Sequence, residues 1–285
     1  MKKLLFLFDT DAFASVFDTV VGYDGGADHI AGYANVTPKT VGALVDGAIF
    51  TRGGKEKQYT AIFVGGGDMA KGEALLKAVK KKFFGPFRVS VMLDSNGSNT
   101  TAAAGVGLLA KAKPLQGKKA VVLAGTGPVG MRAAALLGKE GAEVSLTSRS
   151  KERAENAAKT VEARFGVKAT PIEAFDDVAR AQAVKGAQIV FAAGAIGVQL
   201  LPGSAWQNNP TIEMLADVNA QPPLGLEGVE ATDKGKERAG KLAFGALGIG
   251  GLKLKLHRGC IGQLFESSEQ VLDAEEIYAL AKGMA

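Results

Sequence analysis

Short apolar runs alternate with longer amphipathic stretches along the first part of the chain. Short buried runs predict strands, and apolar positions that recur every three or four residues predict helices. The pattern predicts strands at 4–8, 60–64 and 88–93, and helices at 11–21, 38–50 and about 69–83. Thr37 and Pro38 would begin the second helix and Asp68 would cap the third. Strands that alternate with helices predict a parallel α/β domain.

The same alternation resumes after residue 117. It predicts strands at 119–124, 143–147, 187–192 and 212–217, and helices at 133–137, 151–165 and 273–282. A helix of small residues at 102–112 would carry the chain between domains, and the segment 245–260 would return it. We therefore expect an α/β fold of two domains around a cleft. The first would comprise 1–112 and 260–285, and the second, of Rossmann type, 113–259.

The loop after the strand at 119–124 carries a phosphate-binding pattern, which runs Gly125-Thr126-Gly127-Pro128-Val129-Gly130. In a strand–loop–helix unit the first glycine permits the tight turn and the second lets the backbone approach a pyrophosphate. The third lets the helix pack close to the sheet, with its N-terminus facing the phosphates. The flanking strand and helix make this a dinucleotide site and not a chance match in a chain with 38 glycines.

The end of the next strand indicates which dinucleotide binds. An NAD site usually carries Asp or Glu there, which binds the ribose 2′-hydroxyl. The residues here are 147–151, among them Ser148 and Arg149, with no acid. A guanidinium can hold a 2′-phosphate through paired hydrogen bonds, so we expect NADP as the cofactor. Ser150 could equally cap the following helix, and the two roles are compatible.

Composition restricts the remaining possibilities. The chain has 285 residues, 47% hydrophobic and 22% charged, which suits a globular enzyme with two cores. A net charge of +5 is mild and no basic stripe with interleaved aromatics occurs, so we expect no nucleic-acid partner. One cysteine and two histidines argue against a disulfide and a zinc site. No run reaches the roughly 18 apolar residues of a membrane span, so we expect a cytoplasmic protein without a membrane partner.

Polar or small residues follow several of the predicted strands, where α/β proteins bind ligands. The loop 94–101 contains Asn96, Gly97 and Asn99 as candidate substrate ligands, although such residues also cap helices. Small residues after the strand at 187–192 would let the backbone lie against the cofactor, and they are Ala193, Gly194, Ala195 and Ile196. Two prolines stiffen the loop that holds Asn219 toward the cofactor and Gln221 toward the substrate.

A glycine-rich basic segment at 248–257 is the strongest cluster outside the nucleotide loop. Its polar residues are Lys253, Lys255 and His257. In an extended segment all three would point the same way, and in a helix Lys253 and His257 would share a face. Alternatively, these three residues have no role in binding and simply form the basic, solvent-exposed surface of a helix. Asp9 and Asp11 follow the first strand and could reach the same cleft, or cap the next helix.

Several long motifs resemble one protein family across the whole chain. They lie at 9–11, 21–29, 51–57, 83–87, 94–101, 124–130, 219–225 and 244–257. The sequence resembles the methylene-tetrahydromethanopterin dehydrogenases of methylotrophic bacteria, most of all NADP-dependent members that also accept methylene-tetrahydrofolate. The resemblance implies oxidation of a methylene bridge on a reduced pterin to the methenyl cation, with hydride passing to NADP⁺.

The resemblance also implies an active site in the cleft between the domains of a homo-oligomer, which we expect to be a trimer. Lys253 matches the family motif as the catalytic lysine, and Asp9, Asp11 and the polar residues named above would contact the pterin. Fold relatives that act on folate carry Tyr-x-x-x-Lys in the first domain. Here that spacing occurs only in the terminal helix, at Tyr278 and Lys282, which makes an additional cyclohydrolase activity unexpected.

Two other functions fit the same motifs. The chain could be another NAD(P)-dependent dehydrogenase on this scaffold, of amino-acid or quinate type. It could also bind NADP without turnover as a regulatory protein. Production of NADPH with a methylene pterin would distinguish these possibilities.

Overall fold

The computed structural model describes all 285 residues, which form two compact units. Unit 1 contains Met1–Thr100 and Leu254–Leu280, and unit 2 contains Thr101–Lys253 and Ala281–Ala285. The chain passes between them inside three helices, α4 (Ser98–Ala112), α9 (Ala246–Leu264) and α10 (Ala274–Met284). These crossings differ from the expected boundaries at 112/113 and 259/260. Sequence patterns indicate where a helix ends, and not where its packing partner changes.

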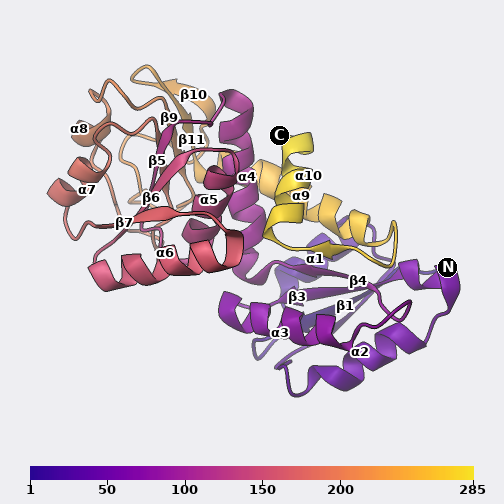
Figure 1. The fold of residues 1–285 in the computed structure, drawn as a ribbon. Helices are drawn as coiled ribbons and strands as arrows, with labels where there is room; N and C mark the ends of the chain where they lie inside the picture. Colours follow the sequence, from indigo (N-terminus) through magenta and orange to yellow (C-terminus); the bar gives the residue numbers. More distant parts are fainter. The chain divides into compact units, whose positions relative to one another are not determined.

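Unit 1 is built on a five-stranded parallel sheet in the order β12-β4-β3-β1-β2 (Figure 1). The strands are β1 (Leu4–Asp9), β2 (His29–Tyr33), β3 (Thr60–Gly65), β4 (Ser90–Leu93) and β12 (Val271–Leu272). The chain runs from β1 outward to β2 and then back to β3 and β4. Right-handed crossovers therefore place α1 on one face and α2 and α3 on the other. These helices are α1 (Val16–Asp24), α2 (Val41–Phe50) and α3 (Met69–Lys82).

The core of unit 1 lies between the sheet and the pair α2 and α3. Every residue of β3 is buried, as expected for a central parallel strand covered on both faces. Ile49 of α2 and Leu75, Leu76 and Val79 of α3 belong to the same buried cluster. The prediction that these three α3 residues share one apolar face is confirmed, as is Asp68, whose carboxylate accepts the Lys71 amide at 3.1 Å.

Unit 2 contains a seven-stranded sheet in the order β10-β11-β9-β8-β5-β6-β7. Only β10 and β11 pair antiparallel. The strands are β5 (Lys119–Leu123), β6 (Glu143–Ser148), β7 (Ala169–Glu173), β8 (Ile189–Ala192), β9 (Met214–Asp217), β10 (Lys234–Arg238) and β11 (Lys241–Phe244). The strand order reverses between β5 and β8, which is where doubly wound sheets bind ligands. The predicted Rossmann-type unit is confirmed.

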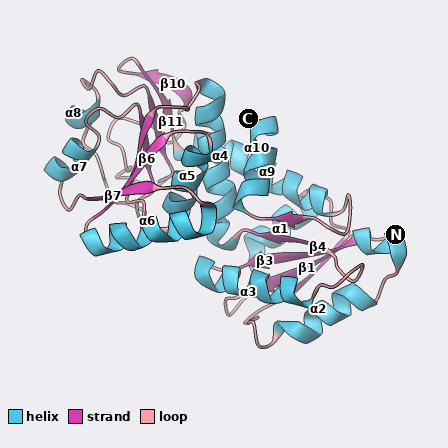
Figure 2. Ribbon diagram, in the orientation of Figure 1, coloured by secondary structure: helices cyan, strands magenta, loops and turns pink.

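The helices of unit 2 follow the βα alternation (Figure 2). They are α5 (Pro128–Lys139), α6 (Lys151–Phe165), α7 (Asp177–Ala183) and α8 (Gly203–Trp206). The bounds of α6 match the prediction, since Ser150 caps its start and Gly166, with φ of 68°, ends it. Trp206 is fully buried and donates its indole N–H to the Glu227 carbonyl at 2.9 Å.

Two predicted helix starts were too early. The helix expected from residue 11 begins at Val16, because Thr10–Ser15 form a turn around the Asp9 carboxylate and Ser15 caps α1. The helix expected from Pro38 begins at Val41, because Thr37 and Thr40 close a turn before it. Conversely, α4 begins at Ser98 and not near residue 102.

Sequence pattern missed the edge strands. In β7 the burial alternates weakly and Pro171 interrupts the run, while β2 is exposed along most of its length. The hairpin of β10 and β11 was also missed, and β10 is largely exposed and charged. An edge strand pairs with a neighbouring strand along one edge only, and these edge strands are largely exposed. Their residues therefore lack the apolar run that reveals a central strand.

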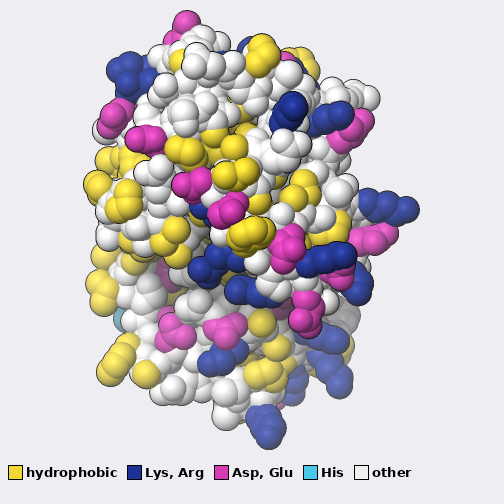
Figure 3. Space-filling model, turned by 90° about the vertical axis from the view of Figure 1, so that its left-hand side faces the viewer, with side chains coloured by type: hydrophobic (Ala, Val, Ile, Leu, Met, Phe, Trp, Pro, Cys, Tyr) yellow, Lys and Arg dark blue, Asp and Glu magenta, His cyan; other side chains and the backbone are white.

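The surface shows no single-sign field on the face drawn in Figure 3, where Lys and Arg side chains are interspersed with Asp and Glu. None of the helices combines the length and the apolar character needed to cross a membrane.

Two short 3-10 helices complete unit 1. They are η1 (Gly54–Tyr59) and η2 (Ser95–Gly97).

Two glycines of α9 provide a matched test of the packing in unit 2. A Cβ at Gly248 would lie 2.0 Å from the Asp233 carbonyl oxygen, whereas a Cβ at Gly250 would meet nothing within 4 Å. We expect Gly248→Ala to lower the free energy of unfolding by about 1–3 kcal/mol through overpacking. Gly250→Ala should raise it by up to about 1 kcal/mol, since alanine is the better helix former. Urea unfolding of both variants measures the difference, and equal effects would contradict the close contact at Gly248.

Candidate functional site

The glycine loop at the carboxyl end of β5 is held against β6 by its backbone. The Gly125 amide donates to the Thr147 carbonyl at 2.9 Å, and the Ala124 amide donates to the Thr147 hydroxyl at 3.1 Å. A Cβ at Gly130 would lie 2.7 Å from the Gly125 Cα, so both glycines are needed for α5 to pack this closely. At Gly127 a Cβ would meet nothing within 4 Å. The loop is therefore closely packed at Gly125 and Gly130, whereas there is free space at Gly127, where a phosphate would lie.

Helix α5 begins at this open position. Gly127 is its N-cap and supplies no capping side chain, and Pro128 is its first residue. The first-turn amides of such a helix and its positive dipole end favour an anion. The residues present therefore fit the pyrophosphate of a dinucleotide.

A pocket of about 510 Å³ extends from the glycine loop across the carboxyl ends of β6, β7 and β8. Of the predicted cofactor residues, it contains Thr126, Gly127, Ser148, Arg149, Ala193, Gly194 and Ala195. Its other lining residues are Ala124, Thr147, Arg153, Ala174, Phe175, Arg180, Val198, Gln199 and Leu200. Three arginines and no acid line it, so the pocket favours a ligand with more negative charge than a ribose hydroxyl alone.

Sequence reasoning missed several of these residues. Arg153 lies one turn into α6, and its amide is the one that Ser150 caps at 3.4 Å. The alternative role for Ser150 as a helix cap is thus observed, beside the basic pocket. Phe175 and Arg180 follow β7, which the pattern did not reveal, so no signal indicated that this segment reaches the pocket. Arg153 lies in the first turn of a helix that the sequence predicts at 151–165, so its place beside Arg149 could have been found from the sequence.

The loop after β9 is organised by a buried aspartate. Asp217 accepts the amides of Asn219 at 3.0 Å and Leu226 at 2.8 Å, and burial raises the pKa of its carboxyl. Asn219 is buried too, and its side chain bonds within the loop to Pro223 and Gln221. Asn219 therefore shapes this loop, and its contact with the cofactor stays a prediction. Gln221 and Ile196 are exposed.

In unit 1, the candidate acids bind backbone amides. Asp9 is buried and accepts the amides of Asp11 at 2.8 Å and Ser15 at 3.0 Å. Asp11 accepts the Gly67 amide at 2.8 Å and joins the β1 and β3 loops. Asp9 thus shapes the turn before α1, whereas the helix itself is capped by Ser15 and not by either aspartate. The side chain of Asp11 is exposed at the same edge of the sheet.

The polar loop after β4 divides into structural and exposed residues. Asp94 accepts the Thr100 amide at 3.0 Å and its hydroxyl at 2.5 Å. Asn99 is fully buried and donates to the Leu93 carbonyl and the Asp273 carboxylate, so its predicted contact with substrate is not supported. Asn96 is exposed with a positive φ of 54°, and Gly97 follows it at the carboxyl edge of β4. These two remain candidates.

The basic segment at 248–257 is helical and belongs to α9. Lys253 is half-buried at the end of unit 2, and Lys255 is exposed in unit 1. His257 is 1% exposed, and its ring stacks on Phe63 with centroids 5.4 Å apart and Nδ1 3.9 Å from the Asp94 carboxylate. The expectation that His257 contacts the substrate directly is therefore not supported, because it packs in the interior of unit 1. The helix separates Lys253 from Lys255 by about 200° of rotation.

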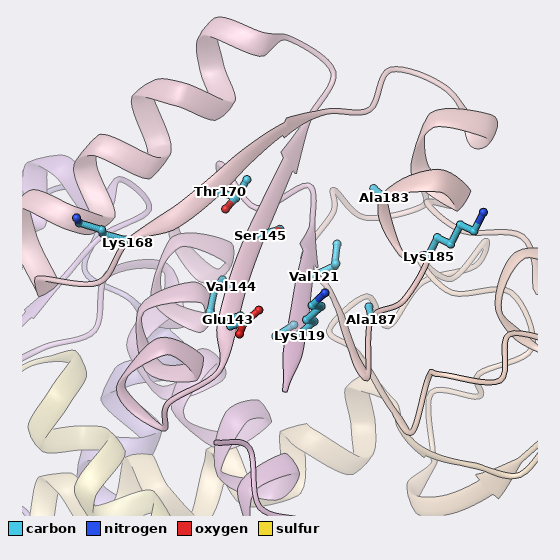
Figure 4. A pocket seen from close by; sticks show the side chains of 11 residues that line it. Lys119, Val121, Glu143, Val144, Ser145, Lys168, Thr170, Ala183, Lys185 and Ala187 are labelled. Carbon is cyan, nitrogen blue, oxygen red and sulfur yellow. The ribbon is translucent and has the colours of Figure 1, made fainter. Parts of the chain in front are cut away.

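A second pocket of about 450 Å³ lies at the opposite, amino-terminal edge of the same sheet (Figure 4). Lys119 and Glu143 stand on neighbouring strands there, while Lys168 and Lys185 extend away on its two sides. It has no glycine loop, and its lysines are exposed. The described residues also include no group of three or more His, Cys, Asp or Glu that could hold a metal ion.

Comparison with known proteins decides the family. The N-terminal family model of methylene-tetrahydromethanopterin dehydrogenase matches residues 16–96. The chain is 72% identical to the bifunctional protein MdtA of Methylorubrum extorquens, over 100% of this chain and 99% of that protein. It is 30% identical to the NAD(P)-dependent methylenetetrahydromethanopterin dehydrogenase of the same organism, over 95% of each chain. The chain belongs to the methylenetetrahydromethanopterin dehydrogenase family. The resemblance drawn from the sequence motifs is confirmed.

Solved structures with the same fold are more distant. A 5-ketofructose reductase of Gluconobacter has a TM-score of 0.51 and 17% identity, and the match covers 100% of this chain and 99% of that one. A shikimate 5-dehydrogenase of Thermus thermophilus, solved with NADP(H) and shikimate, has a TM-score of 0.51 and 15% identity over 99% of each chain. At this identity the likeness shows the fold alone. The predicted fold class is confirmed.

Proposed function

We propose that this protein is an NADP-dependent dehydrogenase that oxidises methylene-tetrahydromethanopterin, methylene-tetrahydrofolate or both to the methenyl form in one-carbon metabolism. The observation that carries the proposal is end-to-end similarity to a relative named for dehydrogenation of this pterin. The basic pocket beside a phosphate-binding loop supports the cofactor. An amino-acid or quinate-type dehydrogenase is not favoured, since the family relatives span nearly the whole chain.

The chemistry requires little from the protein beyond positioning. NADP⁺, when bound, supplies the hydride acceptor at C4 of the nicotinamide ring. The methylene carbon loses a hydride, and the resulting cation is delocalised onto the adjacent pterin nitrogens, so no general base is needed. The residues 125–130 would hold the pyrophosphate, and Ser148, Arg149 and Arg153 the ribose 2′-phosphate. Ala193–Ala195 would let the backbone lie along the cofactor.

Lys253 is the residue we propose to orient the pterin. It lies on α9 two residues after Gly251, and added Cβ atoms at Gly250 and Gly251 would meet nothing within 4 Å. Asn96, Gly97, Asp11, Gln221 and Lys255 are the remaining proposed substrate contacts. A combined cyclohydrolase is not proposed, because Tyr278 is buried in unit 1 and Lys282 pairs with Glu140 at 2.9 Å.

We also propose a homo-oligomer, with a trimer as the expected form, located in the cytoplasm. Exposed apolar side chains on and before α1 support association, because such a group is unusual on a monomer. These residues are Phe13, Val16, Phe17, Val20 and Tyr23. The lone cysteine, Cys260, is buried and without a disulfide, which supports a reducing compartment.

An absorbance assay tests the reaction directly. The purified protein should form NADPH from NADP⁺ when given methylene-tetrahydromethanopterin or methylene-tetrahydrofolate. Quinate and amino acids, supplied at the same concentration, should give no signal. Turnover of those compounds in place of the pterins would support the other dehydrogenases, and cofactor binding without turnover of any substrate would support a regulatory protein.

Arg149 should determine the preference for NADP⁺. Arg149→Ala should raise the KM for NADP⁺ by about tenfold or more while it leaves the KM for NAD⁺ nearly unchanged, because a charge-assisted contact to the 2′-phosphate is lost. Steady-state kinetics with both cofactors measures this. Lys151→Ala is the matched control, since Lys151 is an exposed neighbour outside the pocket lining. Equal changes for the two cofactors would show that Arg149 does not bind the 2′-phosphate.

Lys253 should affect turnover and not cofactor binding. Lys253→Met should reduce kcat by about a hundredfold, since misorientation of a substrate costs several kcal/mol. The affinity for NADP⁺, measured by calorimetry, should stay unchanged. Lys255→Met removes another proposed substrate contact on a different side of the same helix, and it should raise the KM for the pterin while leaving kcat nearly unchanged. Normal turnover in the Lys253 variant, with a loss in the Lys255 variant, would move the assignment to Lys255.

A further inference from the structure

Phe175 is an exposed aromatic side chain at the rim of the cofactor pocket. It is 64% exposed, although phenylalanine is among the residues most often fully buried. Its ring belongs to the lining of the same pocket as Arg149 and Arg153. An aromatic face in a pocket lining gains free energy when a ligand covers it and removes it from water.

The backbone on both sides of Phe175 is fixed. The Ala174 amide donates to the Ser148 carbonyl at 2.7 Å, which ties the end of β7 to the end of β6. On the other side, Asp176 caps α7 by accepting the Ala179 amide at 2.8 Å. Lys151 of α6 also donates its amide to Glu173 at 3.2 Å. Phe175 therefore protrudes from a rigid turn and is not the tip of a loose loop.

The segment after β8, which also lines the pocket, is held in place as well. Arg180 of α7 donates through Nε to the Leu200 carbonyl at 2.5 Å and pairs with Asp177. This contact ties α7 to the segment that follows β8, where Val198 and Leu200 line the pocket. The lining of the pocket therefore combines the aromatic Phe175 with the apolar Val198 and Leu200.

The position of Phe175, just after the end of β7, suits the adenosine end of a dinucleotide. In a doubly wound sheet the adenosine ribose lies at the end of the strand after the glycine loop, here β6. The next strand outward from β6 is β7, which Phe175 follows. We propose that Phe175 forms the stacking wall for the adenine base, with Val198 and Leu200 facing it. The inference rests on the cofactor part of the proposed function, and not on the identity of the second substrate.

This arrangement separates two kinds of recognition within one pocket. Stacking on a phenyl ring depends on the face of the base and is the same for NAD⁺ and NADP⁺. The arginines recognise the 2′-phosphate, which only NADP⁺ carries. Phe175 should therefore contribute to the affinity for both dinucleotides, and Arg149 to the difference between them.

Binding measurements without any pterin test the proposal. Phe175→Ala should raise the Kd for NADP⁺, NAD⁺ and 5′-AMP by a similar factor of about ten, because one stacked base is lost in each case. The Kd for nicotinamide mononucleotide should not change. Val178→Ala is the matched control, since Val178 is 78% exposed on the adjoining α7 and lies outside the pocket lining. Unchanged Kd values for all three ligands, or an increase confined to NADP⁺, would overturn the proposal.

A second variant keeps the test valid if the first fails to fold. Phe175→Trp retains an aromatic face, and the only other tryptophan, Trp206, is fully buried. Addition of 5′-AMP should quench the fluorescence of the new indole at concentrations near its Kd. Absence of quenching under conditions where calorimetry detects 5′-AMP binding would show that the base lies elsewhere. Loss of dehydrogenase activity plays no part in either measurement, so failure of the proposed reaction would leave the adenine site intact.

Discussion

The close contact between Gly125 and Gly130 sets the geometry on which unit 2 depends. A side chain at either position would collide with backbone or with Leu146, so any larger residue would push α5 away from β5. The two hydrogen bonds from the loop to Thr147 then fix the end of β5 beside the end of β6. The amino end of α5 and the basic residues after β6 consequently border one pocket. This one backbone contact therefore brings both elements to the border of the same pocket.

Hydrogen bonds to the main chain connect the other elements that line the same pocket. β6 is joined to β7 by the Ala174 amide, and α7 to the segment after β8 by Arg180. Each link uses a backbone group as donor or acceptor, so the pocket walls are fixed before a ligand binds. A preformed site loses less conformational entropy on binding. Arg149 and Arg153 therefore line the pocket from elements that are held in place by main-chain contacts.

Sequence reasoning reached the central elements and failed at the edges, for physical reasons. β3, β5 and β8 are buried on both faces and appear as apolar runs, and α6 has both caps in its sequence. β7 has neither an apolar run nor a capping residue that marks its ends, because it is an exposed edge strand interrupted by a proline. Because β7 was missed, Phe175 and Arg180 had no predicted place in the fold, whereas Arg149 could be found from its position after the glycine loop. The helical state of 248–257 was left open, because Lys-Leu-Lys-Leu-His alternates like a strand and the three glycines disfavour a helix.

The aspartates at strand ends show why acidic residues in such loops are ambiguous in a sequence. Asp9, Asp94 and Asp217 follow β1, β4 and β9 or end them, and all three are buried. Each accepts backbone amides from the loop or the helix start that follows its strand, at 2.8–3.0 Å. A buried carboxylate is stable only when its oxygens accept hydrogen bonds, and loop amides are unpaired donors that need acceptors. The carboxylates and the amides supply each other's missing partners, so these acids shape the chain at the carboxyl edges of the two sheets. The residues they leave exposed there, such as Asn96, Gln221 and Asp11, are the ones able to meet a ligand.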